Sequence, residues 1–257
     1  MISARLLRGA AGVAGFLVAG ELLIRFALPE GVEFPPPSTV LPEAGRLLVN
    51  GEFLQGVVTT MANWAAGLLL AIAVGVPAGV LLGAVPPVER ALRPILEFLR
   101  PIPSVAIIPL AILLIASDSL MKITVTAYAC LWPVLINTLY GMRDVDPIAK
   151  DSLRSFGFGP LAVLWRVSVP ASAPFMAAGI RIASGVALIL AVSAELFAGG
   201  TAGIGVFVIK AGSVLRLDLI VAATLWAGVL GLLVNLALVA VERRVFHWHR
   251  ARTGEAV

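Results

Sequence analysis

Cysteine and histidine are scarce in this 257-residue sequence, which contains one Cys and two His. Because Cys130 has no second cysteine, the chain can form no disulfide framework and no Cys-X-X-Cys metal or redox site; we expect it to be a small buried residue. His247 and His249 stand two positions apart, on divergent faces of a helix, a spacing that does not suit a shared metal ion. We therefore expect no metal site, and the missing His-Glu-X-X-His pattern argues against a metalloprotease.

Charged residues are also few. They make up 13% of the chain, whereas soluble domains contain about a quarter. The sequence is 60% hydrophobic and its mean hydropathy is +1.00, which together predict an integral membrane protein. The net charge of +4 could suggest a nucleic-acid partner, but the positions of the charges favour an explanation from membrane topology instead, and we expect no nucleic acid.

Apolar stretches of about 20 residues, the length that crosses a bilayer, occur six times. We predict an all-α integral membrane protein forming one domain over residues 1–257, with spans at 9–28, 57–85, 97–116, 119–140, 171–198 and 217–241. Glu21 and Arg25 interrupt the first stretch, so we interpret it as a retained helix and not as a cleaved signal peptide. These two side chains are spaced to pair with each other, as are Asp118 and Lys122.

Glycine and proline mark the second and third spans. Glycines in the second span, at 67, 75, 79 and 83, are common in membrane helices because they allow close backbone approach or a kink. The third span contains the segment RPIPSVAIIP, residues 100–109, whose three prolines predict a broken or irregular helix.

Lys and Arg lie mainly in alternate connections between the spans. If both termini are cytoplasmic, the inner segments hold Arg5, Arg8, Arg90, Arg93, Arg100, Arg143, Lys150, Arg154, Arg166, Arg243, Arg244, Arg250 and Arg252, and the outer segments hold Arg46, Lys210 and Arg216. Thirteen inner cations against three outer ones fit the positive-inside rule and predict this orientation. We expect a multi-pass protein of the bacterial cytoplasmic (inner) membrane with both termini cytoplasmic.

The sequence lacks the Gly-Lys-Ser/Thr motif of ATPase phosphate-binding loops. We therefore expect this chain not to hydrolyse ATP and not to be an enzyme. The stretch GGTAGIG, residues 199–205, follows an apolar helix instead of a strand and carries no Lys, so it predicts a glycine-rich turn or gating loop.

Polar residues 142–170 separate the fourth and fifth spans and carry clear helix signals. Asp146 followed by Pro147 predicts a helix start, and Gly157 predicts its end. A second short helix is expected from Pro160 until Pro170 ends it.

Three apolar residues of this second helix, Leu161, Leu164 and Trp165, are spaced to form one face. A helix of one or two turns is unstable alone in water, so this face must pack on something. Two alternatives remain open from the residues alone: the protein's own membrane domain or the bilayer interface, and a groove on a cytoplasmic partner.

The same segment resembles the cytoplasmic loop of binding-protein-dependent ABC importer permeases. That motif runs Glu-Ala-Ala, three residues, Gly, about nine residues, and an apolar pair ending in Leu-Pro; here residues 151–153 (Asp-Ser-Leu), Gly157 and the pair 169–170 (Val-Pro) take these places. The resemblance covers most of residues 57–245, with segments 88–113, 133–147 and 165–197 similar to the nitrate, sulfonate and taurine branch.

This resemblance implies six membrane helices of the type I ABC importer permease kind, with a cytoplasmic coupling helix between the fourth and fifth spans. It also implies a second permease copy (a homodimer), two ATP-binding subunits that use ATP and Mg²⁺, and an extracytoplasmic solute-binding protein; no cofactor is expected on this chain. The ATPase-docking residues would be Asp151, Arg154, Gly157, Phe158, Leu161, Leu164 and Trp165.

Polar residues at membrane depth are candidates for a translocation pathway or gate. They are Thr60, Asn63, Asn137, Ser193 and Glu195. Each also has a structural interpretation, as an interhelical hydrogen bond or, for Glu195, as a carboxylate that binds backbone amides or caps the dimer interface. An acid repels an anionic solute, so Glu195 is interpreted as a gate or structural acid.

The expected function is a permease subunit that moves a small, anionic solute across the membrane by alternating access, using ATP hydrolysed by a partner. Two alternatives remain. A secondary transporter would need no ATPase, although its typical internal repeats are not evident. A scaffold would recruit a cytoplasmic protein without transporting anything.

Overall fold

The structure is a computed structural model that describes all residues except 1, 28, 30–33 and 246–257. It is helical, and the described residues contain no strand. The elements are α1 (Ile2–Ala27), α2 (Pro37–Leu47), α3 (Gly51–Ala84), α4 (Pro86–Leu99), η1 (Ser104–Ile107), α5 (Ile108–Leu114), α6 (Asp118–Arg143), α7 (Pro147–Ser155), α8 (Pro160–Val163), η2 (Leu164–Ser168), α9 (Val169–Ala198), α10 (Ile204–Ser213) and α11 (Leu217–Val245).

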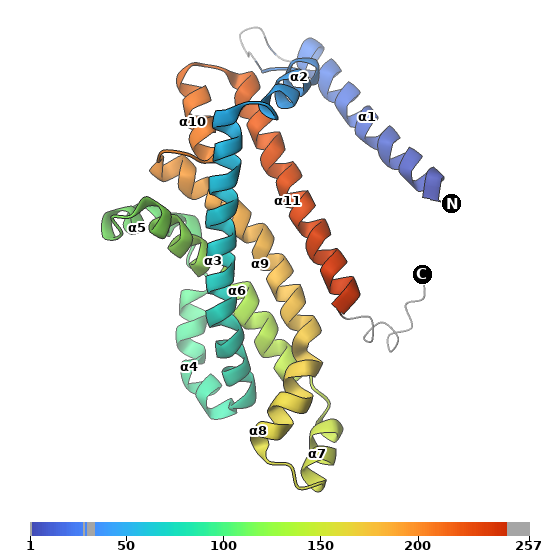
Figure 1. Cartoon of the computed structure of the whole chain (residues 1–257), viewed down its shortest axis with the longest axis vertical. Helices are drawn as coiled ribbons and strands as arrows, with labels where there is room; N and C mark the ends of the chain where they lie inside the picture. Colours follow the sequence, from blue (N-terminus) through green and yellow to red (C-terminus); the bar gives the residue numbers. More distant parts are fainter. Residues whose placement is uncertain (1, 28, 30–33, 246–257) are drawn as a thin grey trace.

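The core of the bundle is formed by α3, α6 and α9, with α11 beside α9 (Figure 1). Of the two alternatives for the glycines of α3, a close approach or a kink, the structure shows the close approach. A Cβ atom on Gly67 or Gly79 would lie 2.7 or 2.6 Å from the Cβ of a threonine on α6, and one on Gly83 would overlap the Met142 side chain. Larger residues would force the two helices apart.

Five helical segments of the described residues are long and apolar enough to cross a membrane. They lie in α1, in α3, in α6, in the continuous segment from α8 to α9, and in α11. The third expected span differs from its prediction. α4 begins at Pro86, well before residue 97, and an irregular stretch separates it from η1 and α5, so that the two halves meet at 79°. The broken helix is as expected from the prolines; counted as one bent span, it brings the total to six.

The expected end of the short helix at Pro170 is wrong. α8, η2 and α9 form one helical segment, Pro160–Ala198, of 39 residues. η2 is a turn of π-helix in which the Val169 amide donates to the Leu164 carbonyl, five residues back. This wider turn changes the hydrogen-bond register just before Pro170, so the proline, which has no amide hydrogen, enters α9 without ending the helix.

α1 stands apart from the bundle and contacts α2 (Figure 1). The expected pair on α1 is confirmed: the Arg25 Nε donates to Glu21 at 2.6 Å. Glu21 also accepts from the amide and the hydroxyl of Ser38, at 3.0 and 2.8 Å, which ties α1 to the first turn of α2. His247 and His249 lie outside the described residues.

Candidate functional site

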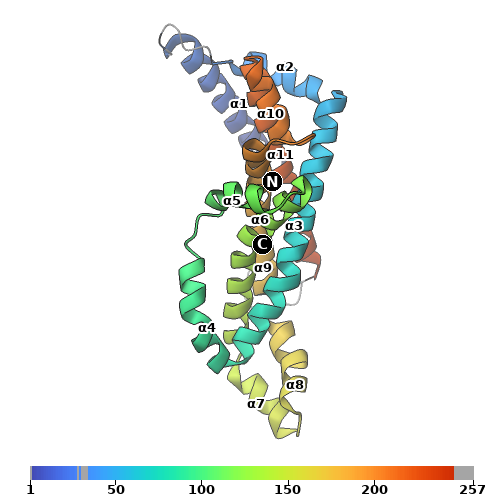
Figure 2. The same cartoon turned by 90° about the vertical axis from the view of Figure 1, so that its left-hand side faces the viewer.

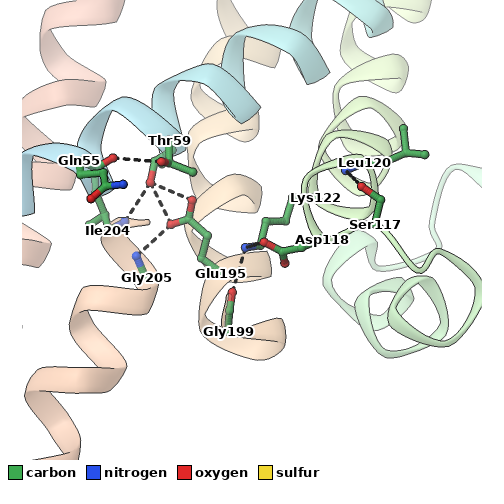
Figure 3. Close-up of polar contacts among 11 residues, drawn as sticks. Gln55, Thr59, Ser117, Asp118, Leu120, Lys122, Glu195, Gly199, Ile204 and Gly205 are labelled. Carbon is green, nitrogen blue, oxygen red and sulfur yellow. Dashed lines mark hydrogen bonds and ion pairs between the residues drawn. The ribbon is translucent and has the colours of Figure 1, made fainter. Parts of the chain in front are cut away.

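The α9 end that faces α10 carries a closed group of polar contacts, which we call the Glu195 cluster: Thr60, Glu195, Ile204 and Gly205. Glu195 is completely buried. Its two carboxylate oxygens accept from the Thr60 hydroxyl at 2.8 and 2.9 Å, and one accepts from the Gly205 amide at 3.0 Å. The Thr60 oxygen in turn accepts from the Ile204 amide at 2.9 Å (Figure 3).

The glycine-rich stretch allows these contacts to form. Gly203 has φ +152°, and a Cβ there would overlap the Glu195 carboxyl group. On Gly205 a Cβ would lie 2.6 Å from the Val192 carbonyl. The expected glycine-rich turn is therefore confirmed. It places the Gly205 amide, in the first turn of α10, on the Glu195 carboxylate, where the helix dipole favours negative charge. The cluster joins α3, α9 and α10.

A second polar contact lies beside the Glu195 cluster. The expected pair is confirmed: the Lys122 ammonium donates to Asp118 at 2.7 Å, and it also donates to the Gly199 carbonyl at 2.9 Å (Figure 3). The Lys122 side chain is fully buried, whereas that of Asp118 is 46% exposed. This lysine holds the end of α9 against α6. Sequence spacing indicated the ion pair but could not indicate the carbonyl, which lies 77 positions away.

The other pathway candidates are not part of this cluster. Asn137 donates to the Pro133 carbonyl of its own helix at 2.8 Å and packs on Gly179 of α9. Asn63 is buried, and its side-chain nitrogen has no partner among the described residues. Ser193 is half-buried and makes no side-chain hydrogen bond within the described part of the chain. Of the five candidates, the structure therefore brings together Thr60 and Glu195.

The opposite end of the bundle is formed by α7 and α8 (Figure 1). The predicted helix signals are confirmed there. Asp146 caps α7 by accepting from the Ile148 amide at 2.8 Å. Gly157 has φ +83° and donates to the Arg154 carbonyl, while the next amide donates to the Leu153 carbonyl, which is a Schellman C-cap. α8 then begins at Pro160, as expected.

Apolar side chains on α7, α8 and the residues just after each of them remain exposed. We call them the α7–α8 apolar face: Ile148, Phe156, Leu161 and Trp165. Their exposed fractions are 74%, 81%, 72% and 65%. Ile148 and Phe156 are not among the predicted docking residues. Their position, near the two ends of a charged helix, was a sequence signal that could have identified them. The predicted single face is divided, because Leu161 and Trp165 are exposed whereas Leu164 is half-buried.

The remaining predicted docking residues surround this face. Arg154 binds Asp151 at 2.9 Å on the exposed side of α7. The Arg166 guanidinium lies over the Phe158 ring, 4.9 Å from its centre. A pocket of about 420 Å³ separates α8 from the junction of α3 and α4, and it is lined partly by Arg154, Leu161 and Leu164. Within the described residues, no group of three His, Cys, Asp or Glu side chains is arranged to hold a metal ion.

Comparison with known proteins identifies the family. Residues 75–247 match the family described as "Binding-protein-dependent transport system inner membrane component". The chain is 30% identical over 220 residues to a taurine transport system permease protein of Escherichia coli, covering 84% of this chain and 80% of that one.

In Synechocystis, a bicarbonate transport system permease protein is 27% identical, with 91% and 86% of the two chains covered. A nitrate import permease protein of the same organism is 28% identical, with 95% and 90% covered.

A solved structure supports the fold independently. The MetNI methionine ABC transporter in inward-facing conformations matches with a TM-score of 0.66 and 17% identity, over 75% of this chain and 95% of that chain. This similarity confirms the expected type I importer permease architecture. Together with the family match and the permease relatives, it leads to one conclusion: the chain belongs to the family of binding-protein-dependent transport system inner membrane components, the permeases of ABC importers.

Proposed function

We propose that this chain is the permease subunit of an ATP-driven importer for a small anionic or zwitterionic solute. The observation that carries the proposal is the single helical segment Pro160–Ala198, which joins the α7–α8 apolar face at one end to the Glu195 cluster at the other. Its relatives are named for taurine, bicarbonate and nitrate, and these names support the solute class.

The proposed partners follow from the two ends of this segment. Two ATP-binding subunits would use ATP and Mg²⁺ and would each cover one α7–α8 apolar face, since exposed apolar side chains at this density mark an interaction site. A second copy of the chain would complete the pathway, and an extracytoplasmic binding protein would deliver the solute. Both termini would be cytoplasmic, on the arginine-rich side.

The Glu195 cluster is proposed to act as a structural part of the outer gate. A fully buried carboxylate whose two oxygens accept from the Thr60 hydroxyl and the Gly205 amide has no exposed surface for a solute. It would instead keep α10 fixed to α9 and α3, so that a displacement of α8 by the ATPases moves α9 and α10 together. Asn63, Asn137 and Ser193 remain predicted pathway residues, and the unpartnered nitrogen of Asn63 supports this role.

Reconstitution tests the function. The permease, its ATP-binding subunits and the binding protein are placed in liposomes, and uptake of radiolabelled taurine, nitrate and bicarbonate is measured with and without internal ATP. We expect uptake of one solute that requires ATP and the binding protein. Uptake driven by an ion gradient without the ATP-binding subunits would instead indicate a secondary transporter. ATP hydrolysis that no solute alters, together with no uptake, would indicate a scaffold.

A further inference from the structure

A cleft between α4 and α6 is rich in arginine. It has a volume of about 260 Å³ and is lined by Glu89, Arg93, Leu96, Glu97, Arg100, Ile136, Leu139, Tyr140 and Arg143. α4 stands beside the bundle instead of packing within it (Figure 2). The cleft lies in the half of the molecule that contains α7 and α8, because the start of α4 lines the neighbouring pocket together with α8.

Two polar contacts hold α4 along this cleft. At one end the buried side chain of Glu89 binds Arg93 on α4 at 3.0 Å and Arg143 on α6 at 2.8 Å. At the other end the Tyr128 hydroxyl donates to the Leu99 carbonyl at 3.1 Å. The cleft thus lies between two polar contacts that join α4 to α6.

The charges lining the cleft do not cancel. Three guanidinium groups face two carboxylates, of Glu89 and Glu97, so the lining carries a net charge of +1. Glu89 is already shared by two arginines, and Arg100 has no acceptor among the described residues. Each guanidinium has five N–H donors, and Arg93 uses two of them on Glu89, so donors remain for a ligand.

We propose that this cleft binds one monovalent oxyanion, the carboxylate, sulfonate or nitrate group of the transported solute, after the solute has left the outer gate. The inference rests on the proposed function for the identity of the ligand. Guanidinium groups bind planar and tetrahedral oxyanions with paired hydrogen bonds, and the two carboxylates disfavour a second negative charge. The same chemistry could hold a phospholipid headgroup, and the experiment below separates the two sources.

The test measures binding directly. The permease with its ATP-binding subunits is placed in phosphatidylcholine nanodiscs, and trifluoromethanesulfonate serves as a monovalent probe whose ¹⁹F line broadens when it binds. Titration gives a Kd for the wild type and three variants that each remove one charge from α4 or from the residue that follows it. We expect Arg100→Gln to raise the Kd by roughly tenfold or more, Glu97→Gln to lower it, and Arg90→Gln, outside the cleft, to leave it unchanged.

Opposite shifts for Arg100→Gln and Glu97→Gln cannot arise from misfolding, which would weaken binding in both. Equal Kd values for the wild type and Arg100→Gln would overturn the site. Loss of the probe signal when phosphatidylglycerol is added would assign the cleft to a lipid headgroup and overturn its role for the solute.

Solute-stimulated ATP hydrolysis, measured on the same samples with the binding protein, tests the proposed function separately. If solute stimulates ATP hydrolysis normally but Arg100→Gln leaves the Kd of the probe unchanged, the proposed anion site in the cleft is rejected and the proposed function stands. If Arg100→Gln raises the Kd of the probe but no solute stimulates ATP hydrolysis or is taken up, the proposed function is rejected. The identification of the ligand as the transported solute is then rejected with it.

Discussion

The two ends of the helix from Pro160 to Ala198 have opposite surfaces. At the Glu195 cluster, a buried carboxylate is surrounded by donors from α3 and α10. At the α7–α8 apolar face, Leu161 and Trp165 project with about two thirds or more of their surface exposed. At the Glu195 end, the buried polar groups find their hydrogen-bond partners within the chain. At the other end, apolar surface remains that only another molecule can cover.

This difference separates the roles of the two ends. A helix of 39 residues is about 58 Å long at 1.5 Å per residue, so one helical segment reaches across a bilayer and beyond it. Its π-helical turn lies at Leu164–Ser168, next to the apolar face and far from Glu195. The end with the exposed apolar side chains therefore contains the irregular turn, and the end at Glu195 is joined to α10 and α3.

The largest effect is expected at the apolar face. The double variant Leu161→Ser and Trp165→Ser removes two exposed apolar side chains. If each is an anchor worth roughly 2 kcal/mol, binding of the ATP-binding subunit weakens by roughly 10³-fold. Co-purification of the ATP-binding subunit and solute uptake should both be lost, while the melting temperature of the isolated permease stays the same, because neither side chain is buried.

A matched control lies at the other end of the molecule. Val214 and Leu215, between α10 and α11, are 66% and 85% exposed, and changing both to Ser should leave the ATP-binding subunit attached. The comparison fails if the first double variant still co-purifies, or if the control releases the subunit equally.

The next largest effect is expected at the Glu195 cluster. There a substitution should lower the stability of the permease and leave binding of the ATP-binding subunit intact. Glu195→Ala leaves the Thr60 hydroxyl and the Gly205 amide without their acceptor in a buried site, at a cost of roughly 1–3 kcal/mol for each group. We expect the melting temperature of the purified permease to fall by roughly 5 °C or more and uptake to fall with it, while the ATP-binding subunit still co-purifies.

Leu196→Ala, at the adjacent and exposed position, is the control and should change the melting temperature little. A normal melting temperature and normal uptake for Glu195→Ala would show that the cluster neither stabilises the fold nor acts in the gate.

Local features at both ends are predictable from the sequence. Asp146, Gly157 and Pro160 mark the helix boundaries correctly because caps and turn residues act within a few positions along the chain. The Asp118–Lys122 pair is predictable for the same reason, since four residues make about one helical turn. Signals of this short range are enough to locate α7, α8 and most of the other helices.

Features that depend on distant contacts could not be predicted. The partners of Glu195 lie 135 positions back on Thr60 and ten positions ahead on Gly205, and no local pattern links them. The half-burial of Leu164 depends on packing. The continuation past Pro170 follows from one π-helical turn, whose register depends on packing and not on the residue types alone. Similarly, the prolines indicated a broken third span but not its 79° bend.

The smallest effect is expected from the exposed pair on α7. Arg154 and Asp151 lie 2.9 Å apart, but their side chains are 62% and 67% exposed, and solvent screens such pairs. Asp151→Asn and Arg154→Gln, made singly and together, should each change the affinity of the ATP-binding subunit by less than about threefold. Pull-down titration at low and high salt measures this.

Such a result would mean that the pair orients α7 while apolar contacts provide the affinity. A much larger loss for Arg154→Gln than for Asp151→Asn would mean instead that Arg154 binds the partner directly, so that part of the affinity of this end comes from charge as well as from apolar surface.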